Sequence, residues 1–151
     1  MRVVAVDADD AHVQALLDRH WQLMRQTSPP DSCHVMDARA LVQADAHLLA
    51  VFDGDRALGV GAITAISDTE AELKSMHTLA AARGRGVGRT ILRALLDQAR
   101  AAGYRTVSLE TGAGPQFRAA RRLYAQEGFE PCPPFGDYRA DPFSVYMTRD
   151  I

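Results

Sequence analysis

The feature that most constrains this chain is a glycine-rich turn placed directly ahead of an amphipathic helix. The turn, Arg83–Thr90, carries Gly84, Gly86 and Gly88, and apolar residues then recur at helical spacing as far as Ala102. Glycines let the backbone turn tightly and come close to a ligand. The free N–H groups of a helix's first turn, together with the helix dipole, attract an anion. The segment therefore predicts a phosphate-binding unit between a strand and a helix.

The remaining elements alternate along the chain in a pattern typical of a mixed sheet. Strands are expected at Val3–Val6, His47–Phe52, Arg56–Ile66, Glu70–Thr78 and Thr106–Leu109, from Phe129, and at Phe143–Met147. Helices are expected from Asp9 or Asp10 to Arg25, and at Asp37–Gln43, Arg89–Ala102 and Gln116–Glu127. The order is roughly βααβββαβαββ. It predicts an α/β (α+β) fold in one domain, residues 1–151, with helices on both faces of the sheet.

Two common phosphate-binding motifs do not fit the turn. The dinucleotide fingerprint GxGxxG requires glycine at the position of Arg89. The P-loop requires a lysine after its last glycine, whereas Gly88 is followed by Arg89, and its first glycine would fall on Arg83. The structural alternative is a helix start that serves packing alone.

The turn does fit the pattern R-x-x-G-x-G, through Arg83, Gly86 and Gly88. A second signature, A-x-x-L-Y-x-x-x-G-F, runs from Ala120 through Tyr124 to Phe129. With the order of elements, these motifs resemble the GCN5-related N-acetyltransferase (GNAT) superfamily over most of the chain. The resemblance implies a mostly antiparallel GNAT sheet and acetyl-CoA as cosubstrate, with no metal required. One position departs from the pattern: Phe117 stands where many members carry an asparagine that contacts the pantetheine arm.

The resemblance also implies which residues hold the coenzyme. The strand before the turn is expected to splay from its neighbour and to pair with the pantetheine arm, with one N–H stabilising the oxyanion. The diphosphate is expected on the turn. The coenzyme-binding residues are then Met76, His77, Thr78, Arg83, Gly84, Arg85, Gly86, Val87, Gly88, Arg89 and Thr90.

Three residues are candidates for the general base when an amine attacks the thioester directly. Glu72 is the first candidate for the general base, Glu110 the second and His77 the third. A salt bridge of Glu72 with Lys74 or an arginine is the structural alternative. The resemblance places Tyr124 where the leaving thiolate needs a proton or a hydrogen bond, and a core aromatic is the alternative for that residue.

The acceptor is expected to be an amine of a small molecule or peptide. Two polar loops, Ser28–His34 and Gly136–Pro142, are candidates for its site, and His34 and Arg139 could hold a carboxylate on it. Two ordinary surface loops are the alternative. The fold is also compatible with a homodimer. An aminoglycoside acceptor would favour a strongly acidic cleft, for which the late loop supplies only Asp137 and Asp141.

Composition restricts the other functional classes. The net charge of −2 and the lack of a basic stripe disfavour nucleic acid as a partner. The first apolar run is too short for a signal peptide or a membrane span, and the two cysteines, Cys33 and Cys132, fit a reducing compartment, so a cytoplasmic protein is expected. A different class remains open: a non-catalytic acyl-CoA-binding sensor or regulatory module, which would retain Arg83–Thr90 but not need Glu72 or Tyr124.

Overall fold

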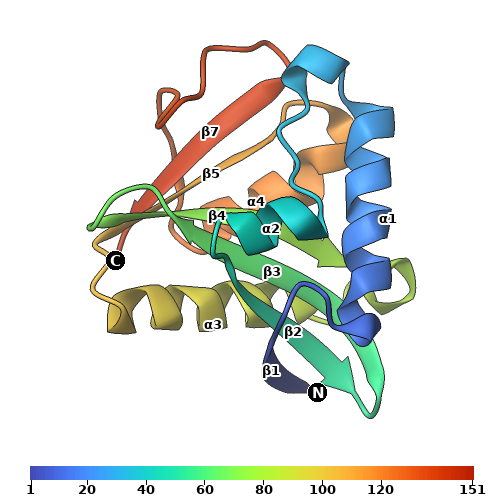
Figure 1. The fold of residues 1–151 in the computed structure, drawn as a ribbon. Coiled ribbons are helices and arrows are strands. Elements are labelled where there is room, and N and C mark those ends of the chain that lie inside the picture. Colours follow the sequence, from blue (N-terminus) through green and yellow to red (C-terminus); the bar gives the residue numbers. More distant parts are fainter.

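The protein is built on one twisted sheet, described for residues 1–151 in a computed structural model (Figure 1). The sheet has seven strands in the order β1-β2-β3-β4-β5-β7-β6. They are β1 (Arg2–Val6), β2 (His47–Asp53), β3 (Arg56–Ala65), β4 (Glu70–Thr78), β5 (Thr106–Gly112), β6 (Glu130–Pro131) and β7 (Ser144–Asp150). Only β4 and β5 run parallel. The predicted mixed, mostly antiparallel fold is confirmed.

Helices cover both faces of this sheet, as predicted (Figure 1). They are α1 (Ala11–Thr27), α2 (Ala38–Gln43), α3 (Val87–Ala101) and α4 (Arg118–Gln126). The alternation of β2 shows why both faces are apolar: Leu48 and Ala50 pack with α1 and α2, whereas Leu49 and Val51 pack with α3 and α4. Each face of the central strands therefore has its own hydrophobic core.

Two helix starts differ from the sequence-based prediction. Helix α3 begins at Val87, two residues before the predicted Arg89, because Gly86 takes a left-handed conformation (φ 79°) and the helix starts directly after it. The predicted helix from Gln116 begins instead as a short 3₁₀ turn, Pro115–Phe117, ahead of α4. The turn thus passes directly into α3, whose buried face includes Ile91, Leu92, Leu95 and Leu96.

The two parallel strands separate part-way along the sheet. β4 pairs with β5 only as far as Leu73 opposite Leu109, although both strands continue beyond that pair. The register of β4 against β3 also shifts, and Ser75 has a left-handed φ of 57°. Such a bulge bends a strand and increases its local twist. The sheet therefore opens between the ends of β4 and β5.

No helix in the structure has both the length and the apolar character needed to cross a membrane.

Candidate active site

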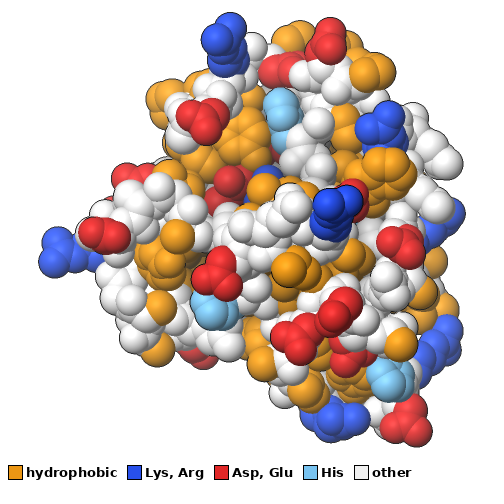
Figure 2. Space-filling model, viewed as in Figure 1, with side chains coloured by type: hydrophobic (Ala, Val, Ile, Leu, Met, Phe, Trp, Pro, Cys, Tyr) orange, Lys and Arg blue, Asp and Glu red, His pale blue; other side chains and the backbone are white.

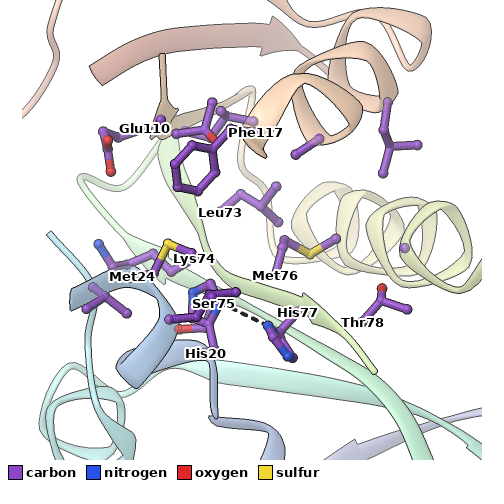
Figure 3. Close-up of a pocket in the computed structure, with 18 of the residues that line it drawn as sticks. His20, Met24, Leu73, Lys74, Ser75, Met76, His77, Thr78, Glu110 and Phe117 are labelled. Atoms are coloured by element: carbon purple, nitrogen blue, oxygen red, sulfur yellow. Dashed lines mark hydrogen bonds between the residues drawn. The ribbon is translucent and has the colours of Figure 1, made fainter. Parts of the chain in front are cut away.

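A cavity of about 740 Å³ occupies the opening between β4 and β5. Its wall combines the end of α1, the loop after it, the second half of β4, the glycine turn, the end of β5, α4 and Tyr138. Figure 3 shows Thr78 near α3 at one side of the cavity, and Lys74, Met24 and Glu110 toward the other. On the face shown in Figure 2, charges of both signs are scattered among hydrophobic side chains, so no single sign dominates it.

The glycine turn supplies free backbone donors at one end of the cavity. The first backbone hydrogen bond of α3 runs from the Thr90 N–H to the Gly86 carbonyl, at 3.0 Å, so the N–H groups of Val87, Gly88 and Arg89 have no helical acceptor. Gly84 and Gly86 both have φ 79°, and a Cβ at either would meet no atom within 4 Å. The turn lines the cavity, and a helix start with free N–H groups is where an anion binds.

The end of β4 forms the second wall. Past Leu73 its backbone has no pairing with β5, so the groups of Met76, His77 and Thr78 on that side are free of the sheet ladder. All three residues line the cavity. An extended ligand can pair with such an edge in the way that an added strand does.

His77 also contacts α1, where sequence reasoning named no site residue. Its Nδ1 lies 3.3 Å from Nδ1 of His20, so one ring donates and the other accepts (Figure 3). Burial is the main cause that lowers the pKa of each ring to about 4, and the neighbouring His77 lowers that of His20 further. His20 shares the helix stripe of Leu17 and Met24, and that spacing is the signal that could have identified it.

Tyr124 and Phe117 bring α4 and its leading turn to the cavity. Tyr124 is 6% exposed and packs edge-on against Phe129, with the ring centroids 5.9 Å apart. Burial, and then the charge of Glu110, raise the pKa of its phenol well above the ordinary value, so the phenol keeps its proton at neutral pH. The ring of Phe117 lies against Gly112, where any Cβ would overlap it.

Glu72 is committed to other residues of the protein. Its Oε2 lies 3.2 Å from Lys74 Nζ and accepts a hydrogen bond of 2.5 Å from the Tyr138 hydroxyl. Lys74 Nζ also donates to the Tyr138 hydroxyl at 3.1 Å and to the His34 carbonyl at 3.4 Å. We call Glu72, Lys74 and Tyr138 the buried ion-pair network. It joins β4 to both polar loops. Glu72 thus forms the salt bridge with Lys74 that was the structural alternative to a general base.

Glu110 has a different environment. It lies on β5 beyond the last pair with β4, and it lines the same cavity (Figure 3). No salt bridge engages it. Burial raises the pKa of its carboxyl, and Ser144, His34 and Lys74 together offset only part of that effect. A carboxylate with a raised pKa is a stronger base than an ordinary one.

Of the two residues expected to hold the acceptor, His34 lies at the cavity and Arg139 does not. His34 lines the cavity, and its ring meets that of Tyr138 edge-on at 5.0 Å. Arg139 is exposed and outside the lining, and its carbonyl accepts a hydrogen bond from the Tyr146 hydroxyl. Tyr138 itself was not singled out from the sequence, because its partner Glu72 is 66 residues away.

Comparison with known proteins identifies the family. The model of the acetyltransferase (GNAT) family matches residues 13–129. The chain is 40% identical over 139 residues to YedL of Escherichia coli, an uncharacterised N-acetyltransferase, covering 92% of this chain and 87% of YedL. It is 34% identical over 151 residues to YsnE of Bacillus subtilis, also an uncharacterised N-acetyltransferase, covering 100% of both.

Solved structures share the fold over nearly the whole chain. A protein of Klebsiella pneumoniae described as an acyl-CoA N-acyltransferase has a TM-score of 0.77 at 27% identity, covering 99% of this chain and 96% of that one. The yncA structure from Salmonella typhimurium, which contains its cofactor acetyl-CoA, has a TM-score of 0.70 at 18% identity, covering 99% and 92%.

Fold, cavity and relatives together define an acyltransferase. More specifically, the chain belongs to the acetyltransferase (GNAT) family.

Proposed function

We propose that the protein binds acetyl-CoA in the cavity between β4 and β5 and transfers the acetyl group to a primary amine by direct attack. The observation that carries the proposal is the convergence of three features in one cavity: the free N–H groups of Val87–Arg89, the unpaired edge of β4, and the half-buried carboxyl of Glu110. A diphosphate, an extended arm and an amine would each find a matching partner there.

The residues present fit the coenzyme. The left-handed Gly84 and Gly86 leave open space at the turn, and the cationic Arg83 and Arg89 line the cavity beside it. Arg85 lies outside the lining and pairs with Asp53 at 3.6 Å. The diphosphate would lie on the turn, and the pantetheine arm along Met76–Thr78. Phe117 has no polar side-chain atom, so it would offer the arm apolar contact in place of an asparagine hydrogen bond. When bound, the coenzyme supplies the activated acetyl group.

Of the two carboxylates, Glu110 suits the general base better than Glu72. The Oε2 of Glu72 already accepts hydrogen bonds from the Tyr138 hydroxyl and the Lys74 ammonium, and both bonds stabilise the anionic form of Glu72. Glu110 has no such cation partner, and burial raises its pKa. We therefore assign proton removal from the amine to Glu110, directly or through water, and assign Glu72 to holding the buried ion-pair network.

Tyr124 would stabilise the departing thiolate by donating a hydrogen bond. Its phenol has a reference pKa of about 10, above the value of about 8.5 for a thiol, so complete proton transfer to the thiolate would be uphill. Burial raises the pKa of Tyr124 further and makes transfer still less favourable. A hydrogen bond needs no transfer, and one to a charged group contributes about 1.5–3 kcal/mol.

The experiment is an assay of free thiol released from acetyl-CoA across a panel of amines, amino acids, polyamines, aminoglycosides and peptides, with each product identified by mass spectrometry. We expect amine-dependent thiol release and an amide product. A protein that binds acetyl-CoA but acetylates no amine would instead be the sensor or regulatory module. Glu110→Gln and Tyr124→Phe separate the two, because a sensor would bind the coenzyme and respond to it unchanged in both variants.

A further inference from the structure

The charges and apolar side chains around the cavity restrict the acceptor, if the proposed function holds. We propose that the acceptor is a primary monoamine on an apolar or aromatic skeleton that carries no carboxylate. The inference concerns the part of the cavity away from the glycine turn, where the end of α1, the loop Ser32–Met36, Phe117 and Tyr138 form the wall. This part must receive the acceptor, because the turn is assigned to the diphosphate.

Only one charge in that part of the wall has no partner of opposite sign. Among all cavity-lining residues the acids are Glu72 and Glu110, and the cations are Lys74, Arg83 and Arg89. Glu72 and Lys74 neutralise each other, with side chains 13% and 9% exposed. Glu110 is thus the one negative charge available to an ammonium, and a second ammonium would be desolvated without a partner.

A carboxylate on the acceptor would find no available cation. The three protons of the Lys74 ammonium already have acceptors in Glu72, the Tyr138 hydroxyl and the His34 carbonyl. Arg83 and Arg89 flank the glycine turn at the coenzyme end, and Arg89 also pairs with Glu127 at 3.0 Å. The carboxylate would instead face Glu110, and like charges brought together oppose binding.

The same part of the wall also offers apolar surface. Leu23, Met24, Val35, Met36 and the rings of Phe117 and Tyr138 line it, between uncharged polar residues such as Thr27, Ser28 and Gln116. Burying apolar surface contributes about 25 cal/mol per Å². A hydrocarbon or aromatic skeleton gains from contact with these side chains, whereas the second ammonium of a polyamine would lose its hydration without a partner of opposite charge. The carboxylate clamp of His34 and Arg139 expected from the sequence is not part of this proposal, since Arg139 does not line the cavity.

The test compares amines that differ by one charged group, in the thiol-release assay with wild-type protein. The pairs are 2-phenylethylamine with phenylalanine, which adds a carboxylate, and butylamine with 1,4-diaminobutane, which adds an ammonium. We expect kcat/KM to be at least about tenfold higher for the first member of each pair, since an unpaired buried charge costs more than the 1.4 kcal/mol that tenfold represents. Equal or better rates with phenylalanine or diaminobutane would overturn the inference, as would coenzyme uptake with no acetylation of either monoamine.

A charge change in the wall provides a second readout. Lys74→Met leaves Glu72 unpaired, so the ratio of diaminobutane to butylamine rates should rise by about tenfold or more. The matched double variant, Lys74→Met with Glu72→Gln, removes both charges and should restore the wild-type preference. An unchanged ratio in a folded Lys74→Met protein would contradict the charge account. Absence of coenzyme uptake by wild-type protein in calorimetry would instead reject the proposed function itself.

Discussion

Replacing Gly86 by alanine tests the glycine turn without filling any packed space. Gly86 has φ 79°, and a Cβ there would meet nothing within 4 Å. The cost to folding is therefore conformational, about 1–2 kcal/mol for an L-residue in the left-handed region. For a chain of this size each kcal/mol lowers Tm by about 2–4 °C, so Gly86→Ala should lower it by about 2–8 °C.

Gly54 offers a matched control in the turn between β2 and β3. It also has a positive φ, 59°, with nothing within 4 Å of a built Cβ, and it does not line the cavity. Gly54→Ala should therefore lose similar stability. Only Gly86→Ala puts a methyl group at the proposed diphosphate site, and loss of one hydrogen bond to a charged group, about 1.5–3 kcal/mol, would weaken coenzyme A binding by about tenfold to a hundredfold.

The assay is calorimetric titration of coenzyme A into wild-type protein and both variants, with Tm measured alongside. The expected result is a comparable Tm loss in the two variants and a selective loss of affinity in Gly86→Ala. Equal affinities for the two folded variants would refute the assignment of the turn to the diphosphate, because Gly54→Ala carries the same backbone strain without a methyl group at the proposed site.

Three further variants test individual side chains. Glu110→Gln should lower kcat by about 10²–10⁴-fold. A general base acts when deprotonated, and burial raises the pKa of Glu110, so the wild-type rate should rise with pH above the ordinary carboxyl range. A Glu110→Gln variant whose rate still rises in that way would exclude Glu110 as the general base. Tyr124→Phe should lower turnover about tenfold or more at unchanged coenzyme affinity, and wild-type turnover would exclude the thiolate contact. Burial lowers the pKa of His20 and His77 from 6.5 to about 4, so protons favour the unfolded chain and stability should fall as pH drops from 6.5 toward 4. His20→Gln should lose less stability over that window in urea titrations, and an equal loss would show that the histidine pair is not the cause.

The sequence alone predicted the features that depend on local chemistry. Strand and helix order follow from periodicity, and the phosphate-binding character of the turn follows from three glycines ahead of an amphipathic helix. The splay of β4 came from the family resemblance. The left-handed Ser75 carried no signal, because serine has no special freedom at positive φ and the bulge is imposed by pairing with β3.

The two candidate carboxylates show the limit of such reading. Glu72 and Glu110 are both strand glutamates, on β4 and β5, and only their surroundings distinguish them. The hydroxyl that donates a hydrogen bond to Glu72 belongs to Tyr138, on a loop 66 residues further along the chain. Long-range packing of this kind decides which carboxylate is neutralised, and no spacing rule in a single sequence encodes it.

Amide hydrogen exchange with and without coenzyme A tests the central claim most directly. The account predicts new protection at Val87–Arg89, whose N–H groups have no helical acceptor, and within Met76–Thr78, on the side of β4 that has no pairing with β5. Binding without protection at either segment, or protection confined to another part of the molecule, would contradict the placement of the coenzyme between β4 and β5.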